Sequence, residues 1–323
     1  MTQHRLSDAE FSRMAEDARN RHNLSDIIGR HTELKRAGRE LVGICLFHSE
    51  KSPSMRVNDA KGFYHCFGCG SHGDAIRFVM DYEGRSFMEA LRWLGDADLP
   101  IVAPEDRIRA AAEDAAASAR SVADAGELWE RCVDPVGTPA QIYALSRGIT
   151  APLPMSIRFG MVPAGKTKAG EWRDDLPAMV GGCFNEGGDL VAIQRIFLRN
   201  GGRAKAQMQR PKLSLGRVRG SALRLGPVAA EIILCEGPED GLTLMQELPG
   251  ASVWVALGTG LMPFVEFPAD VRSVVLAGDN NDAGRMAIAK AGEALALRGV
   301  ATKTMFPDPA FSDFNDQLRG IRI

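Results

Sequence analysis

The sequence predicts a multidomain protein that combines α+β and α/β parts, and three observations support this prediction. Three cysteines and a histidine cluster between positions 45 and 69, where the chain is rich in turns. Residues 132–228 are punctuated by proline and glycine and contain short strand-like runs without a clear period. From residue 231, apolar runs alternate with helical patterns, which is typical of a mainly parallel sheet with crossover helices.

These patterns divide the 323 residues into four regions: a metal-binding module at 1–100, a helical linker at 101–131, a mixed α+β subdomain at 132–228 and an α/β domain at 229–323. Helices are expected at 7–22, where Ser7 and Glu10 form a capping box, and after Asp74, which caps the next one. A further helix is expected in SFMEALRWLG, and an extended segment at 33–44.

The overall composition is that of an ordinary globular protein and excludes few functions. The net charge is −2, so the total indicates no polyanionic partner. No apolar run approaches the roughly 18 residues that span a bilayer, and the N-terminus lacks the apolar core of a secretion signal. We therefore expect a cytoplasmic protein without membrane association.

The cysteine and histidine cluster predicts a structural zinc site. Its spacing is Cys45-x2-His48-x17-Cys66-x2-Cys69, in which two tight turns can face each other around one tetrahedral ion. The alternative is a redox-active CxxC pair, but such a pair would not need the second pair formed by Cys45 and His48. His65 and His72 flank the cluster as outer-shell or nucleic-acid contacts. Three further cysteines are isolated and are expected to be buried: Cys132, Cys183 and Cys235.

Cations and aromatic residues surround the predicted zinc ligands. The cations are Lys51, Arg56 and Lys61, and the aromatic residues are Phe63, Tyr64 and Phe67. Such a mixture suits single-stranded nucleic acid, whose phosphates pair with cations and whose bases stack on rings. The aromatic residues can equally pack against the zinc turns, as small domains require. The two interpretations are compatible.

A long stretch without acidic residues lies between Asp189 and Glu231. It contains nine cations: Arg195, Arg199, Arg203, Lys205, Arg210, Lys212, Arg217, Arg219 and Arg224. Most charged runs are simply solvated, but repulsion within a run of one sign has to be offset. Phosphates offset it well, so this stretch predicts binding of nucleic acid or nucleotide phosphates.

Acidic residues follow the predicted strands of the last domain. Glu236 ends EIILCE, Asp240 lies one helical turn further on, and Asp279 ends SVVLAGD, while Asp313 lies in SDFNDQL. In open parallel sheets, ligands bind beyond the carboxyl ends of the strands. These carboxylates are therefore expected to converge on a magnesium site, although Asp282 can simply cap the helix that begins at Ala283.

These segments resemble a known family. LVGICLFHSEKSPSMRV and GFYHCFGCGSHGDAIRFVM look like the CHC2-type zinc-binding domain of bacterial and phage-type DNA primases, over about residues 23–96. ILCEGPEDGLTL, VALGTGL, LAGDNNDAG and DFNDQL resemble a Toprim domain, over about residues 230–322. The basic segment between them is similar to the region that precedes Toprim in phage and plasmid primases.

The resemblance implies roles for individual residues. Glu236 corresponds to the Toprim glutamate, as metal ligand or acid/base group, and Asp240 to the acid that follows it. Asp279 begins the DxD motif and binds magnesium, for which manganese can substitute, and Asp313 completes the site. The basic stretch holds template and nucleoside triphosphate, and the zinc module recognises the template sequence or helps to initiate the primer.

The sequence departs from the family pattern at one position of the DxD motif. The second aspartate is replaced by Asn281, which can ligate magnesium through its carbonyl but brings no charge. Either Asp282 substitutes for it, or a second ion binds weakly. No helicase domain follows DFNDQLRG, so a replicative helicase partner is expected to be a separate protein.

The resemblance implies magnesium-dependent synthesis of short RNA primers on single-stranded DNA from ribonucleoside triphosphates. One alternative is a Toprim nuclease. A Toprim enzyme that passes DNA strands is disfavoured, because it needs a tyrosine nucleophile and the sequence contains only Tyr64, Tyr82 and Tyr143. The other alternative is a non-catalytic replication accessory protein that binds zinc and single-stranded DNA.

Overall fold

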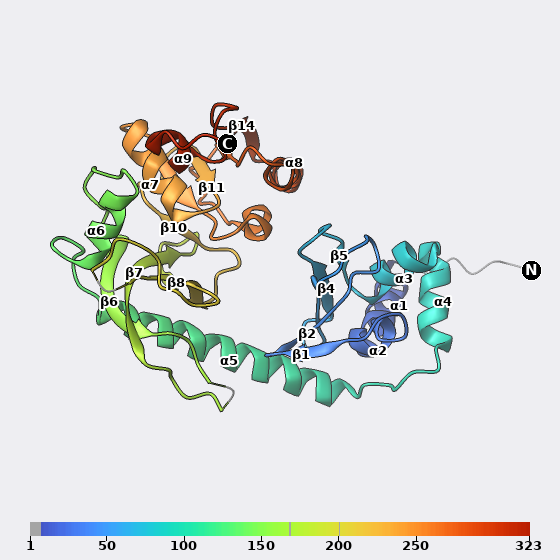
Figure 1. The fold of residues 1–323 in the computed structure, drawn as a ribbon. Coiled ribbons are helices and arrows are strands. Elements are labelled where there is room, and N and C mark those ends of the chain that lie inside the picture. Colours follow the sequence, from blue (N-terminus) through green and yellow to red (C-terminus); the bar gives the residue numbers. More distant parts are fainter. Residues whose placement is uncertain (1–7, 168, 200) are drawn as a thin grey trace, which may run out of the picture. The chain divides into compact units, whose positions relative to one another are not determined.

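The computed structural model describes residues 8–167, 169–199 and 201–323 and forms two compact units, Met1–Ala117 and Ser118–Ile323 (Figure 1). Ser7 of the expected capping box lies outside the described residues. Within the described ranges, no helix is long and apolar enough to cross a membrane.

The first unit contains a five-stranded antiparallel sheet in which each strand pairs with its neighbour in sequence. The strands are β1 (Lys35–Ala37), β2 (Glu40–Gly43), β3 (Met55–Asn58), β4 (Phe63–Cys66) and β5 (His72–Gly73). The helices are α1 (Asp8–Asn20), α2 (Leu24–Ile28), α3 (Ala75–Glu83) and α4 (Phe87–Asp96). Apolar side chains of sheet and helices share one core, which includes Ile27, Met55, Tyr64 and Phe78.

Local signals place the helices of this unit as the sequence predicts. The Asp74 side chain accepts a hydrogen bond from the Arg77 amide and begins α3, and Gly84 ends it in a left-handed conformation. Ser86 and Glu89 form a reciprocal capping box at the start of α4. The predicted linker contains the 27-residue helix α5 (Pro104–Glu130).

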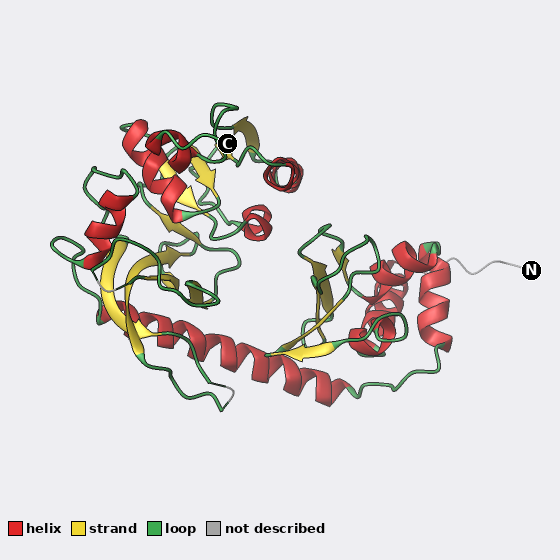
Figure 2. Ribbon diagram, viewed as in Figure 1, coloured by secondary structure: helices red, strands yellow, loops and turns green. Residues whose placement is uncertain are grey.

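The second unit is built on one mixed sheet of nine strands, coloured yellow in Figure 2. Its strands are β6 (Ile157–Pro163), β7 (Asp175–Phe184), β8 (Leu190–Phe197), β9 (Lys212–Gly216), β10 (Ala222–Arg224), β11 (Glu231–Cys235), β12 (Ser252–Val255), β13 (Ser273–Ala277) and β14 (Ala301–Met305). The order is β14-β13-β11-β12-β10-β7-β8-β9, with β6 beside β7. The predicted parallel α/β part is thus confirmed in β11 to β14, which pair in parallel.

The sheet continues without a break from the parallel strands into the antiparallel ones. Strand β10 pairs with β12 on one side and with β7 on the other, antiparallel in both cases. The basic subdomain and the α/β domain, which the sequence divides near residue 229, therefore share a sheet.

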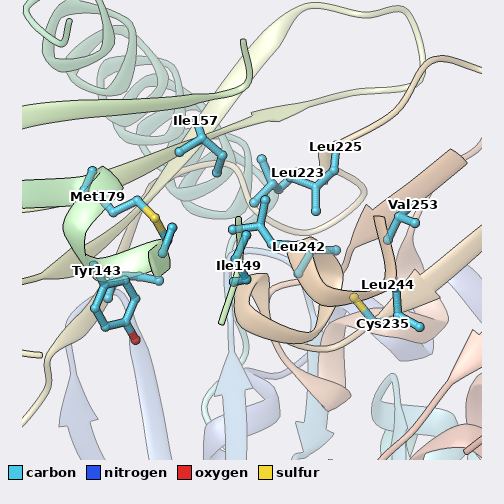
Figure 3. Close-up of a cluster of buried hydrophobic side chains, with 14 of the residues drawn as sticks. Tyr143, Ile149, Ile157, Met179, Leu223, Leu225, Cys235, Leu242, Leu244 and Val253 are labelled. Atoms are coloured by element: carbon cyan, nitrogen blue, oxygen red, sulfur yellow. The ribbon is translucent and has the colours of Figure 1, made fainter. Parts of the chain in front are cut away.

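Alternate residues of the parallel strands face two different cores, which explains why these strands are continuous apolar runs in the sequence. Ile233 and Cys235 of β11 face one core, shown in Figure 3 together with Leu242 of helix α7 (Pro238–Glu247). Ile232 and Leu234 face a second core on the opposite side of the sheet. Strands buried on both faces need apolar residues at every position.

The remaining helices cover these faces: α6 (Pro139–Ser146), α8 (Asp282–Ala296), α9 (Phe314–Arg319) and the 3-10 helix η1 (Thr259–Phe264). Tyr143 of α6 extends from the core of Figure 3, with its hydroxyl at the edge of the cluster. The three isolated cysteines are buried, as predicted.

Candidate active site and zinc cluster

A polar pocket of about 320 Å³ lies at the carboxyl ends of the parallel strands. It brings together the four acids that the sequence predicts with two of the predicted cations. The lining residues are Arg147, Lys205, Lys212, Glu236, Gly237, Glu239, Asp240, Asp279, Asp313, Asn315 and Asp316.

Each acid of the pocket is placed by the end of a strand or the start of a helix. Glu236 follows β11 directly, and Asp279 comes two residues after β13. Asp240 lies in the first turn of α7. Asp313 is the N-cap of α9 and accepts a 2.6 Å hydrogen bond from the Asp316 amide. The topology of the sheet therefore brings acids from distant sequence positions to one edge.

Backbone groups support two of these carboxylates. The amide of Thr259, which begins η1, hydrogen-bonds to Glu236. This turn follows Leu257, whose φ is 68°, the left-handed region that side chains with a Cβ rarely adopt. The amide of Asn315 donates a 3.0 Å hydrogen bond to Oδ1 of Asp240. Both contacts fix the carboxylates before any ligand arrives.

Burial and mutual repulsion hold the pKa values of the acids high. Burial, followed by the neighbouring Asp313, raises the pKa of Asp240 to about 7. Burial and Glu236 raise the pKa of Asp279 to about 6. Burial also raises the pKa of Glu236, against the opposing charge of Lys212. Carboxylates that repel one another in a partly dehydrated pocket fit a hard divalent cation, which would neutralise them.

A second group of charges lines the other side of the pocket around Glu239, which is only 7% exposed. Its Oε1 accepts hydrogen bonds from the Tyr143 hydroxyl at 2.8 Å and from Lys205 Nζ at 2.7 Å. Its Oε2 accepts one from Lys212 Nζ at 3.0 Å. Burial favours the neutral acid, but Lys212 and Lys205 outweigh it and lower the pKa of Glu239 to about 2.

Arg147 extends this basic side of the pocket. Its Nε lies 3.3 Å from the Tyr143 hydroxyl, and its guanidinium lies 5.4 Å from the centre of the tyrosine ring. Asn315 donates a 2.9 Å hydrogen bond to the backbone carbonyl of Arg147. The pocket thus places carboxylates, which suit a divalent cation, beside three cations, which suit phosphate groups.

Asn281 and Asp282 are not among the residues that line the pocket. Both are exposed, and Oδ1 of Asn281 accepts a 2.8 Å hydrogen bond from the Gly284 amide as the N-cap of α8. Gly284 packs against Asp279, where a Cβ would lie 2.7 Å from the Asp279 carbonyl oxygen. The capping role that the sequence allowed for Asp282 therefore belongs to Asn281.

The residues of the basic stretch have different surroundings. Arg199, Arg203, Arg210, Arg217 and Arg219 are exposed. Arg219 lies over the Phe264 ring, with its guanidinium 3.3 Å from the ring centre, and Arg224 lies over Trp254 at 4.2 Å. Only Lys205 and Lys212 of this stretch line the pocket.

Arg195 requires a correction. It is 2% exposed, and its guanidinium donates hydrogen bonds to the carbonyls of Pro163 and Ser214. Burial lowers its pKa to about 10. A side chain enclosed in this way is not placed to contact nucleic acid, so Arg195 is removed from the predicted contacts.

In the first unit, the four predicted zinc ligands form a tight cluster. One ligand atom from each of Cys45, His48, Cys66 and Cys69 lies within 4.8 Å of the others. Two amides, those of Gly68 and Cys69, point at Cys66 Sγ at 3.3 and 3.4 Å. Three cysteine sulfurs and one histidine nitrogen gathered in this way are a donor set that suits tetrahedral zinc.

Glu50 orients the histidine of this cluster. Its Oε2 lies 3.3 Å from His48 Nε2, while His48 Nδ1 lies 3.7 Å from Cys66 Sγ. Glu50 Oε1 accepts hydrogen bonds from the amides of Cys45 and Ser54. A carboxylate on the far nitrogen fixes the ring so that Nδ1 faces the metal position.

Some of the cations and aromatic rings near the cluster pack inside the unit, and others are exposed, where nucleic acid could reach them. Tyr64 is buried in the core of the unit, whereas Phe67 is 52% exposed with Arg56 over its ring at 5.7 Å. Arg56 also pairs with Glu40, and Lys61 lies 3.7 Å from Asp114, while Lys51 is exposed. His65 is buried beside Phe67, and His72 Nδ1 contacts the Gly70 carbonyl.

Comparison with known proteins identifies the domains. The CHC2 zinc finger family matches residues 11–105, a domain of unknown function (DUF7146) matches 119–225, and the Toprim domain matches 231–320. The chain therefore combines a CHC2 zinc finger with a Toprim domain, and the resemblance to DNA primases is confirmed for these parts.

DNA primases are among the proteins that this chain is similar to. The chain is 44% identical over 92 residues to a DNA primase of Lactococcus lactis, covering 28% of this chain and 14% of that protein. It is 34% identical over 156 residues to a DNA primase of Enterococcus faecalis, covering 46% of this chain and 25% of that protein. The crystal structure of the zinc-binding and RNA polymerase domains of Aquifex aeolicus primase aligns with 95% of this chain and 82% of that chain, at 22% identity and a TM-score of 0.43. The matches to the two curated primases thus span a quarter or less of their length.

Proposed function

We propose that this chain is a DNA primase that synthesises short RNA primers on single-stranded DNA by magnesium-dependent nucleotidyl transfer. The observation that carries the proposal is the pocket, where Glu236, Asp240, Asp279 and Asp313 face two lysines and an arginine. The zinc finger and Toprim matches support it.

The pocket residues have complementary tasks in this reaction. Glu236, Asp279 and Asp313 would hold magnesium, with Asp240 beside them. The ion would supply positive charge at the attacked α-phosphate and at the departing pyrophosphate. Arg147, Lys205 and Lys212 would bind the phosphate oxygens of the incoming nucleoside triphosphate.

Bond making and breaking occur at the α-phosphate. The 3′-hydroxyl of the preceding nucleotide attacks that phosphate, the bond to the β-phosphate breaks, and pyrophosphate leaves. Glu236, whose pKa is raised by burial, is placed either to hold the metal ion or to accept the proton of the hydroxyl.

The zinc finger is proposed to hold one zinc ion through Cys45, His48, Cys66 and Cys69. Four protein ligands close the coordination shell, so the ion would stabilise the fold of this unit rather than take part in chemistry. The exposed Phe67 with Arg56 offers a surface for template bases and phosphates. A separate helicase partner remains a prediction.

A priming assay tests the proposed function. The full chain is incubated with random single-stranded DNA, ribonucleoside triphosphates and magnesium, and labelled products are resolved by length. We expect primers from the wild type and none from Glu236→Gln. The matched control is Glu231→Gln, at the opposite, exposed end of the same strand. Synthesis that survives Glu236→Gln would contradict the site, and no synthesis on any template would contradict the function.

A further inference from the structure

The first turn of α7 carries two neighbouring acids with different surroundings. Asp240 lies among acids, and its pKa is raised, whereas Glu239 is surrounded by donors. The two Glu239 oxygens together accept from one hydroxyl and two ammonium groups. Two ammonium groups already balance the charge of this buried carboxylate, so Glu239 is less suited to a metal ion than Asp240 and serves another purpose.

We propose that Glu239 is a positioning residue, which holds Lys205 and Lys212 so that their remaining N–H groups form a binding site for the polyphosphate of the incoming nucleotide. The inference rests on the proposed function, because it assigns the polyphosphate end of the same pocket. Glu239 lies within the Toprim match, and the sequence pattern assigns it no role.

The geometry of the lysines carries the proposal. Each ammonium group has three donors and uses one of them on Glu239. Both lysines line the pocket, with side chains 26% and 37% exposed, so the other donors remain available to a ligand there. The Tyr143 hydroxyl fixes Glu239 from the protein side.

Charge provides the second argument. Two ammonium groups on long flexible stems repel each other and would separate in the absence of a counter-charge. Glu239 lies within 3.0 Å of both, so its negative charge keeps them together before any phosphate binds. Cations that are already in place lose less conformational freedom on binding.

A simple electrostatic view predicts the opposite effect of removing this carboxylate. Glu239→Gln removes one negative charge, so the pocket becomes more positive and by itself attracts a polyanion more strongly. Positioning predicts weaker binding, because the lysines are released. The sign of the change in affinity therefore distinguishes positioning by Glu239 from simple attraction between the pocket and the polyanion.

The test measures binding of inorganic tripolyphosphate to the zinc-loaded full chain in magnesium buffer by calorimetry. We expect Glu239→Gln to weaken binding about tenfold, the usual order of coupling between contacting charged residues. Glu239→Asp keeps the charge but is too short to reach both lysines, and it is expected to weaken binding as well. Glu247→Gln, on the exposed end of the same helix, is the matched control and should bind like the wild type. Equal or tighter binding by Glu239→Gln or Glu239→Asp would overturn the proposal.

A double-mutant cycle shows whether Glu239 acts through the lysines. In a chain with Lys205→Met and Lys212→Met, adding Glu239→Gln should cause no further loss of affinity. An equal further loss in that background would also overturn the proposal. Thermal melts of each variant check that the fold is kept, and Glu239→Asp serves alone if Glu239→Gln does not fold.

The outcomes separate this inference from the proposed function. Tripolyphosphate binding that depends on Glu239, in a chain that makes no primers, would refute priming and leave the polyphosphate site standing. Primer synthesis by the wild type, with binding unaffected by Glu239→Gln, would refute the inference and leave priming standing.

Discussion

The Tyr143 hydroxyl donates a 2.8 Å hydrogen bond to Oε1 of Glu239, although 96 residues separate the two in the sequence. The bond joins α6 to the first turn of α7, where Glu239 lines the pocket. Tyr143 is 1% exposed, so neither partner has water as a ready substitute. We therefore expect this contact to contribute to both stability and the charge arrangement of the pocket.

Tyr143→Phe removes the donor and leaves the buried Glu239 with two partners. We expect a loss of about 1.5 to 3 kcal/mol in the free energy of unfolding, the usual size for a hydrogen bond to a charged group. Urea titration measures it. The matched control is Tyr82→Phe, at a tyrosine that is 37% exposed. Equal stability of Tyr143→Phe and the wild type would contradict the prediction.

Asp240→Asn tests the repulsion among the pocket acids. The pKa of Asp240 is raised in the folded state, so its favourable contribution is complete below the unfolded pKa of about 4 and is lost as the pH rises through about 7. Without added magnesium, the variant should therefore gain in melting temperature over the wild type, and gain more at about pH 8 than at about pH 5.

Magnesium provides the complementary measurement for this acid. An ion that neutralises the carboxylates should raise the melting temperature of the wild type at about pH 8, and raise that of Asp240→Asn by less. A variant that is no more stable than the wild type at either pH would show that Asp240 is not under strain.

Asn281→Asp tests the departure from the DxD motif. Asn281 caps α8 and does not line the pocket, and aspartate caps helices equally well. We expect the magnesium affinity of Asn281→Asp to match the wild type, whereas Asp279→Asn should weaken it strongly. Asn281→Ala should cost about 1 kcal/mol of stability through loss of the cap. A large gain of magnesium affinity in Asn281→Asp would instead place position 281 in the metal site.

Glu50→Gln tests the support of the zinc cluster. Loss of the carboxylate on His48 Nε2 should weaken zinc binding by about 10- to 100-fold, as is usual for partners of metal ligands. Competition with a chromophoric chelator measures the affinity. Glu33→Gln, whose side chain is 79% exposed, is the control. Unchanged zinc affinity would mean that the backbone alone orients His48.

Two arginines of the basic stretch should differ in their effect on DNA binding. Arg217 is exposed, so Arg217→Ala should reduce the slope of log affinity against log salt for single-stranded DNA by about 0.7 if it contacts a phosphate. Arg195→Met should leave that slope unchanged and alter stability instead, because Arg195 is buried. A reduced slope in Arg195→Met would show that the arginine becomes accessible in the complex.

The strand-end acids were predictable because their positions follow from topology alone. Carboxyl ends of parallel strands share one edge, and the apolar runs before Glu236 and Asp279 mark those ends. The zinc ligands were predictable from spacing in the same way. Both predictions depend on short-range patterns that any fold of this class must satisfy.

The residues that sequence reasoning missed depend on contacts between distant segments. Glu239 meets Tyr143 and Lys212 only after the antiparallel strands join the sheet, and consecutive acids in EGPED were the only local sign. Glu50 carried no signal beyond lying two residues from His48. Counting charges alone led to the wrong prediction for Arg195. Its position two residues from both Ile193 and Phe197 along β8 places it on the same buried face as these two side chains.

The sheet of the second unit also connects the acidic side of the pocket to its basic side. From β11, which Glu236 follows directly, backbone ladders run through β12, β10, β7 and β8 to β9, which begins at Lys212. The relative placement of the proposed metal site and of Lys212, the proposed phosphate contact, therefore depends on every strand pairing between β11 and β9. Because the short β10 connects β12 to β7, a proline at Leu223 would disturb the geometry of the pocket without altering a charged residue.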